Sequence, residues 1–322
     1  MAKTVLLIMA HGVFGWGADK VQAEDQIRDY YYGIKTFLED EYGPIKRPDI
    51  RLVTVAPSVP PSENVAGRGA VLLGAIQEAM KNCAPGTRAH ILAHSMGGLD
   101  ARWAIVQPEL KGRIASLTTI AAPHRGTTLG NLAQAEAPLL FRIGGVLDFF
   151  YWIWRLVWRY FPIRQANPDQ IILLGQLLHN LAGSTLGQVQ RGLYALTLEG
   201  ASKFNKQQAQ AEEQTRTNVV YFSYGGKAQP GQIGMLKPSH EILEHFGTAE
   251  EKQSGNDGAV SVWSAHYPWD DGGQDYARTI PFDHFMQVNW RIPDPRPKPD
   301  MNDDLKAVYR DIMNNILRVQ QS

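Results

Sequence analysis

Short apolar runs rich in β-branched residues recur along the chain and alternate with segments of helical periodicity. The runs lie at residues 4–10, 50–56, 88–93, 114–121 and 218–224, and the helix-like segments lie at 25–41, 66–82 and 96–107. Because the runs are apolar at consecutive positions, they suit strands that are covered on both faces. Strands that alternate with helices build parallel sheets with helices on either side. The pattern therefore predicts a doubly wound α/β fold.

The alternation stops after about residue 127 and resumes near residue 217. The interval contains no convincing strand, so we expect residues 128–216 to form a mostly helical cap inserted into one α/β domain that spans residues 1–322. A proline-rich connector at 292–300 precedes a final segment with helical periodicity. Its apolar residues share one face and should pack on the sheet: Leu305, Val308, Tyr309, Ile312, Met313, Ile316 and Leu317.

Charge and cysteine content exclude several classes of protein. Thirty-two basic residues balance 32 acidic ones, so no nucleic acid is expected as a partner. The single cysteine, Cys83, rules out an internal disulfide and a cysteine metal cluster. The apolar run after Lys3 leads directly into HGVFGWG with no cleavage region between them, so we expect no cleavable signal peptide. A cytoplasmic location, export without a cleavable signal and prior removal of a signal all stay open.

The segment RAHILAHSMGGLDARWAIV joins a predicted buried strand to a predicted helix. Ser95 lies at the junction, with Ala93 two residues before it and Gly97 two residues after it. Small residues at these positions allow the strand and the helix to approach each other closely, as in a nucleophile elbow, which holds a serine hydroxyl at an exposed tip. A serine with a purely structural role is the alternative. We interpret Ser95 as a candidate nucleophile.

An acylated serine also needs hydrogen-bond donors for the oxyanion. One donor in this architecture is the backbone N–H of the residue after the nucleophile, which is Met96 here. It lies at a helix N-terminus, whose partial positive charge favours an anion. The second donor comes from a loop after an early strand, and Val13 in HGVFG is the candidate. The alternative is a glycine-rich turn that only lets the chain leave the strand.

The nucleophile requires a histidine base and a carboxylate to orient it, in the chain order Ser, Asp, His. Asp257 in SGNDGAVSV has the setting of a loop carboxylate at a strand end, and His284 follows with room for one more excursion of the chain. His266 is the alternative base, but it would place acid and base on one tight hairpin. Asp283 cannot easily orient its own neighbour and is expected to be a loop acid. The other histidines suit a strand, a loop, the cap or positions before the acid: His11, His90, His94, His124, His179, His240 and His245.

Several motifs in this order resemble the bacterial true lipases and the related class 2 lipases, which are α/β-hydrolases. They are HGVFGWG, DYYYGIKTFL, LAHSMGGLDARW, APHRGTTLGNL, SGNDGAVSVWSA and DHFMQVNW. The resemblance implies a triad of Ser95, Asp257 and His284, with Val13 and Met96 forming the oxyanion hole. It also implies a helical lid after the strand that follows the nucleophile, where residues 128–216 lie.

The chain departs from the family at the position of a structural calcium. Many members bind this ion through an aspartate two residues after the catalytic histidine, and the residue there is Met286. A thioether is a poor ligand for a hard cation that prefers oxygen. We therefore predict no metal site and no cofactor.

Eight aromatic residues crowd the stretch DFFYWIWRLVWRYF at 148–161. As a helix it would reach only about 21 Å, too short to cross a bilayer core of about 30 Å. We interpret it as an amphipathic lid that covers an acyl-binding cleft or faces a lipid–water interface. An ordinary core helix or a subunit contact is the alternative.

These observations together predict a serine carboxylic ester hydrolase of the lipase type. Its substrates would be acylglycerols or other long-chain fatty acid esters, cleaved through an acyl-enzyme at Ser95. A phospholipase or a lipid acyltransferase would use the same triad on another substrate or acceptor. A lipid-binding protein without catalysis is the alternative from a different class, although such a protein has no need of a complete triad.

Overall fold

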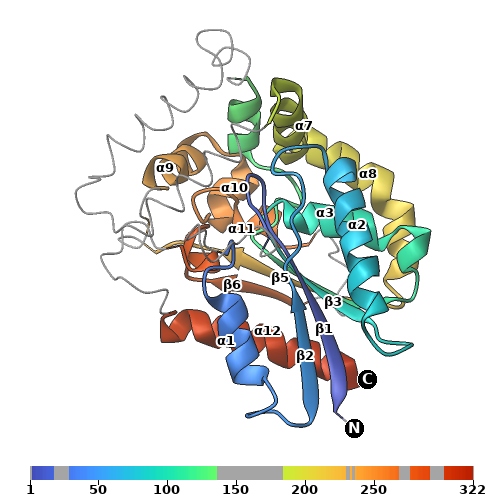
Figure 1. The fold of residues 1–322 in the computed structure, drawn as a ribbon. Helices are drawn as coiled ribbons and strands as arrows, with labels where there is room; N and C mark the ends of the chain where they lie inside the picture. Colours follow the sequence, from blue (N-terminus) through green and yellow to red (C-terminus); the bar gives the residue numbers. More distant parts are fainter. Residues whose placement is uncertain are drawn as a thin grey trace.

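A computed structural model describes residues 2–17, 29–135, 184–229, 233, 236–267, 276–290 and 301–321 (Figure 1). Within these ranges, parallel strands form one six-stranded sheet in the order β2-β1-β3-β4-β5-β6. The strands are β1 (Lys3–Ala10), β2 (Ile50–Val55), β3 (Ala89–His94), β4 (Ile114–Ile120), β5 (Val220–Gly226) and β6 (Tyr276–Ile280). The five predicted strands correspond to β1 to β5, whereas β6 has no counterpart in the prediction.

Helices flank this sheet. They are α1 (Ile34–Tyr42), α2 (Val65–Lys81), α3 (Gly97–Ile105), η2 (Pro108–Leu110), α7 (Leu186–Leu196), α8 (Leu198–Thr215), α9 (Lys237–Phe246), α10 (Ala249–Ser254), α11 (Val262–Ala265), η4 (Met286–Val288) and α12 (Asp303–Gln321). The predicted helices at 66–82 and 96–107 match α2 and α3. The one predicted at 25–41 begins later, since residues 29–33 are not helical and Gly33 adopts a left-handed conformation before α1.

Side chains of β1 divide the core into two layers. Val5, Leu7 and Met9 pack in the cluster that contains the buried faces of α1 and α12. Leu6 and Ile8 point the other way, into the cluster built with α2 and α3. This alternation is the period-two geometry of a strand that is buried on both sides. In Figure 1, α1 and α12 accordingly lie on one side of the sheet, and α2 and α3 lie on the other.

The predicted cap at 128–216 is described only at its two flanks. Residues 128–135 are helical, and α7 and α8 form the return to β5. A buried ion pair between Arg102 on α3 and Glu212 on α8, with N···O 2.7 Å, fastens the second flank to the α/β core. The aromatic stretch at 148–161 lies outside the described residues, so its interpretation as a lid stays a prediction. None of the described helices is long and apolar enough to cross a membrane.

The sheet order places the ends of β1 and β3 side by side. From β1 the chain moves outward to β2 and then returns across β1 to β3. In open α/β sheets, ligands bind at the carboxyl ends of the strands where the strand order reverses in this way. The loops after β1 and β3 contain Val13 and Ser95, so the predicted nucleophile and the predicted oxyanion loop meet at this point.

Candidate active site

Ser95 occupies a strained turn between β3 and α3. Its φ is 55°, a left-handed backbone conformation that residues other than glycine rarely adopt. The Ser95 N–H donates to the carbonyl of Ile120 on the neighbouring strand at 2.9 Å, which holds the turn against the sheet. At Gly97, a Cβ atom would lie 2.7 Å from the carbonyl oxygens of Ala10 and His11. The close approach predicted from the small residues around Ser95 is thus present.

The loop after β1 closes a tight turn over this serine. Gly15 N–H donates to Gly12 O at 3.3 Å, and a Cβ atom at Gly12 would lie 2.8 Å from the Ser95 Cβ. Phe14, with φ 61°, donates its N–H to Pro61 O at 2.6 Å. In contrast, the N–H groups of Val13 and Met96 donate to no acceptor among the described residues.

Arg68 holds the loop after β1, which is the predicted oxyanion loop, and was not singled out in the sequence. Its Nη2 donates to the carbonyls of His11 and Gly12 at 3.0 and 3.1 Å, and its Nε donates to Asp100 on α3 at 2.8 Å. Both charged side chains are fully buried. The sequence does contain a signal for this role, because Arg68 falls between Val65 and Leu72 on the apolar face of α2.

Asp257 and His284 form a buried hydrogen-bonded pair. The distance between His284 Nδ1 and Asp257 Oδ2 is 2.9 Å, and the backbone N–H of His284 donates to the Asp257 carbonyl, also at 2.9 Å. Asp257 lies in a loop after α10, and His284 follows β6. The segment after Asp257 is not one of the six strands of the sheet; the chain turns at Gly258, which has a left-handed φ of 91°, and enters α11.

The alternative base His266 and the neighbouring acid Asp283 make other contacts. His266 does not line the pocket that contains Ser95, and its Nε2 is 3.1 Å from the carbonyl oxygen of Arg278. Asp283 accepts the N–H groups of Phe285 and Met286 at 3.0 and 2.8 Å and so caps the turn that follows His284.

His94 and Tyr30 form a second buried pair next to His284. Tyr30 Oη lies 2.7 Å from His94 Nδ1, and the His94 and His284 rings are 4.6 Å apart between centroids. Burial, and secondarily the proximity of His284, holds the pKa of His94 well below its usual value. His94 is therefore a neutral neighbour of His284. No sequence pattern indicates this contact, and His94 was set aside with the other histidines.

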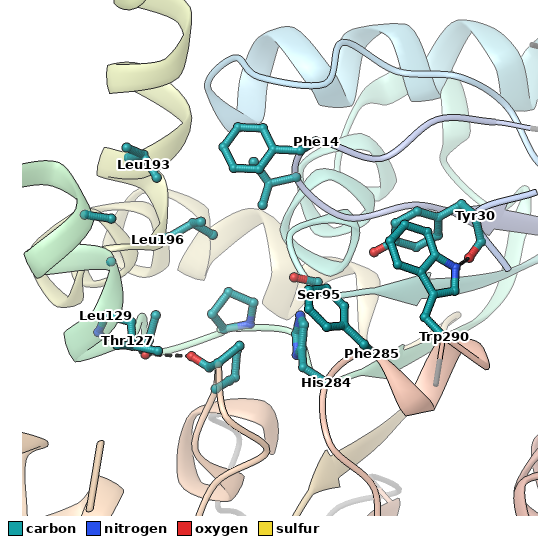
Figure 2. Close-up of a pocket in the computed structure, with 16 residues that line it drawn as sticks. Phe14, Tyr30, Ser95, Thr127, Leu129, Leu193, Leu196, His284, Phe285 and Trp290 are labelled. Carbon is teal, nitrogen blue, oxygen red and sulfur yellow. Dashed lines mark hydrogen bonds between the residues drawn. The ribbon is translucent and has the colours of Figure 1, made fainter. Parts of the chain in front are cut away.

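A pocket of about 240 Å³ contains Ser95 and His284 (Figure 2). One wall is aliphatic and comes from the 128–135 helix and α7, with Leu129, Leu193 and Leu196. The other wall is aromatic, with Tyr30, Phe285 and Trp290, while Phe14 lies above Ser95. Further lining residues are Val13, Pro123, Thr127, Gly130, Ala133, Ala259 and Val260. Such an apolar pocket with a few convergent polar groups is typical of a small-molecule site.

Met286, at the position where the lipases that the sequence resembles have a calcium ligand, is partly buried against the core cluster around α12. Within the ranges that the structure describes, no three His, Cys, Asp or Glu side chains gather in a way that could hold a metal ion. The expectation of a site without metal or cofactor stays a prediction.

The parallel sheet, the elbow after β3 and the Asp257–His284 pair beyond β5 and β6 define an α/β-hydrolase fold. Solved structures share it: lipase 1 from Pelosinus fermentans superposes with a TM-score of 0.57 at 16% identity, covering 96% of this chain and 98% of that one. The mature Bacillus licheniformis lipase BlEst2 gives a TM-score of 0.56 at 16% identity, covering 97% and 91%.

Sequence comparison adds a relationship to bacterial lipases. The chain is 27% identical over 257 residues to Lipase 1 of Staphylococcus aureus (strain NCTC 8325 / PS 47), which covers 66% of this chain and 35% of that protein. It thus spans about a third of the length of the curated relatives it matches. No family model matches the chain. The predicted resemblance to bacterial lipases is confirmed, and the fold is that of an α/β-hydrolase.

Proposed function

We propose that this protein is a serine hydrolase that cleaves carboxylic esters through an acyl-enzyme on Ser95, with acylglycerols and other long-chain fatty acid esters as substrates. The observation that supports this most directly is the buried Asp257–His284 pair, whose histidine shares an apolar pocket with Ser95. The S. aureus relative carries the name lipase, which favours lipid esters within this class.

The hydrogen bond to Asp257 assigns the roles of the two His284 nitrogens. A carboxylate only accepts, so Nδ1 carries the hydrogen and Nε2 of the neutral ring is the acceptor. His284 Nε2 takes the proton of Ser95 as the serine oxygen bonds to the ester carbonyl carbon. Asp257 keeps the ring oriented and stabilises the imidazolium that forms.

The tetrahedral intermediate places its negative oxygen at the turn above Ser95. The free N–H groups of Val13 and Met96 would bind it there, and each such donor typically contributes about 3 kcal/mol to transition-state stabilisation. The intermediate then expels the alcohol, which receives the proton from His284. Water attacks the acyl-enzyme by the same route, and the fatty acid leaves with Ser95 restored.

The substrate chain would lie against the aliphatic wall of Leu129, Leu193 and Leu196. This wall comes from the two described flanks of residues 128–216, which supports our proposal that this interval is a cap over the site. An acyl chain buried there would leave water, at roughly 25 cal/mol per Å² of apolar surface. A lipid–water interface is accordingly the proposed partner surface.

A fluorophosphonate probe tests the proposal. It should label the parent on the peptide that contains Ser95 and should fail to label Ser95→Ala, while Ser202→Ala, a change at an exposed position of α8, serves as the matched control. An ester panel from short to long acyl chains should show turnover that Ser95→Ala abolishes. Absence of both labelling and turnover would favour a lipid-binding protein instead.

The same panel separates the related activities. Release of fatty acid from triacylglycerol in preference to phospholipid supports the lipase proposal, and the reverse preference would indicate a phospholipase. Formation of a new ester when an alcohol is added, at the expense of free acid, would indicate an acyltransferase.

A further inference from the structure

Gln287 lies in η4, three residues after His284, and its side chain is fully buried. Its Nε2 donates to Asp257 Oδ2 at 2.9 Å and lies 3.3 Å from the carbonyl oxygen of Phe282. Both neighbours can only accept a hydrogen bond. The amide must therefore present its nitrogen to them, because the flipped orientation would place an oxygen against two acceptors.

This contact fills the last acceptor position of Asp257. Its Oδ1 accepts the N–H groups of Ala259 and Val260 at 2.9 and 2.7 Å, and its Oδ2 accepts His284 Nδ1 and Gln287 Nε2, both at 2.9 Å. A carboxylate has about four acceptor sites. Since Asp257 has no exposed surface, water has no access to a site left open.

The backbone around Gln287 is shaped to allow this contact. A Cβ atom at Gly226, the last residue of β5, would lie 2.1 Å from Gln287 Nε2 and 2.7 Å from the Asp257 Cβ. Only glycine lets the strand end pass so close to both side chains. Tyr309 on α12 donates its hydroxyl to the backbone carbonyl of Gln287 at 2.8 Å. The backbone of Gln287 is thus tied to α12, while its side-chain amide reaches Asp257.

We propose that Gln287 is a positioning residue, a neutral donor that fixes the Asp257 carboxylate so that its Oδ2 faces His284 Nδ1. This inference rests on the serine hydrolase function proposed above and deepens it. The two backbone donors hold Oδ1, and Gln287 holds Oδ2, so the carboxylate cannot rotate. His284 is then aligned before substrate binds.

Gln287→Met removes the donor and keeps much of the volume of the side chain. One acceptor site of Asp257 then opens in a place that water does not reach, so the carboxylate can tilt away from His284. We expect kcat per active site to fall by about tenfold to fiftyfold, because hydrogen bonds to charged groups are the stronger ones. KM should stay within about twofold, since Gln287 does not line the pocket.

The measurement normalises turnover to the number of sites titrated by the fluorophosphonate, which removes any effect of a smaller folded fraction. A low-field proton NMR signal from His284 Nδ1–H should move or broaden in the variant. Asn289→Gly is the matched control: it removes a buried amide from the same loop, one that donates to Tyr32 O at 2.9 Å rather than to Asp257. Its left-handed φ of 65° suits glycine. It should lower the melting temperature but leave kcat per titrated site within about threefold.

Gln287→Glu tests the requirement for a neutral donor. At low pH the new carboxyl group is protonated and can donate to Asp257 as the amide does, whereas at higher pH two carboxylates repel each other. The kcat/KM of this variant relative to Gln287→Met should therefore rise as the pH falls. A purely structural role would give a constant ratio.

The possible failures are distinguishable. If the parent is neither labelled at Ser95 nor active on any ester, the proposed function is wrong. If the parent is labelled and active, but Gln287→Met keeps kcat per titrated site within about threefold and leaves the low-field signal in place, Gln287 does not position Asp257.

Discussion

The guanidinium group of Arg68 lies 2.8 Å from the carboxylate of Asp100, and both side chains are buried. The pair joins α2 to α3, and the same guanidinium donates to the carbonyls of His11 and Gly12. One side chain therefore balances a buried charge and also fixes the loop of the proposed oxyanion hole. The two roles can be separated by mutation.

Arg68→Met should lower the free energy of unfolding by about 3–5 kcal/mol, because it leaves Asp100 as an uncompensated buried charge. The double variant Arg68→Met/Asp100→Leu removes that charge and should recover most of the stability. Its kcat per titrated site should remain at least about tenfold below the parent, since the loop carbonyls have lost their donors. Chemical denaturation and esterase assays measure the two effects. Full recovery of turnover in the double variant would mean that Arg68 acts on stability alone.

His284→Ala should reduce kcat/KM as severely as Ser95→Ala, by about four orders of magnitude or more, because the members of a triad act as a unit. His266→Ala should keep turnover within about fivefold, since His266 contacts the Arg278 carbonyl outside the pocket. Steady-state kinetics on a soluble ester compare the variants. The opposite ranking would show that His266 is the base.

Ala121→Gly should raise the free energy of unfolding by about 1 kcal/mol. Ala121 follows β4 with φ 48°, a left-handed conformation that is costly for a residue with a Cβ atom and allowed for glycine. The expected rise in melting temperature is about 2 °C. Ala122→Gly is the control, because that neighbour has no positive φ and its methyl group packs against α3. It should destabilise the fold. A lower melting temperature in Ala121→Gly would show that the strain is absent.

Acid should destabilise the protein partly through His90, whose pKa is lowered from 6.5 to about 4 by burial. Above pH 6.5 the ring is neutral in both states. As the pH falls from 6.5 to about 4, the unfolded chain binds a proton that the folded chain does not, so stability falls by about 3 kcal/mol across this window. In His90→Gln, the loss of stability between pH 6.5 and about 4 should be smaller by about 3 kcal/mol. Denaturation midpoints of the parent and of His90→Gln at several pH values test this. The same dependence of stability on pH in both proteins would contradict it.

EDTA should neither inactivate the protein nor lower its melting temperature. Met286 occupies the position where the lipases that the chain resembles have a calcium ligand, and it packs, partly buried, against the core cluster around α12. Thermal melts with EDTA and then with added calcium provide the check. A fall of several degrees that calcium restores would reveal a site elsewhere in the chain.

Local sequence patterns were enough to predict the core of the fold. The apolar runs of β1 to β5 and the buried face of α12, including Leu305 and Tyr309, follow from short-range periodicity alone. β6 escaped prediction because three of its residues, Ala277, Arg278 and Thr279, are exposed and the strand has no apolar run. A strand that is buried on both faces is apolar at consecutive positions, whereas a strand with exposed residues gives no such run.

The order of motifs also singled out Ser95, Asp257 and His284, since each lies in a recognisable local setting. The supporting contacts depend on tertiary structure. Arg68 reaches the turn around Gly12, and Gln287 reaches Asp257 past Gly226, over separations that no local spacing encodes. Periodicity reports which face of an element is buried, but packing decides which distant donor meets which acceptor. Only the assembled sheet, with β1 beside β3 and β5 beside β6, brings these groups within hydrogen-bond distance.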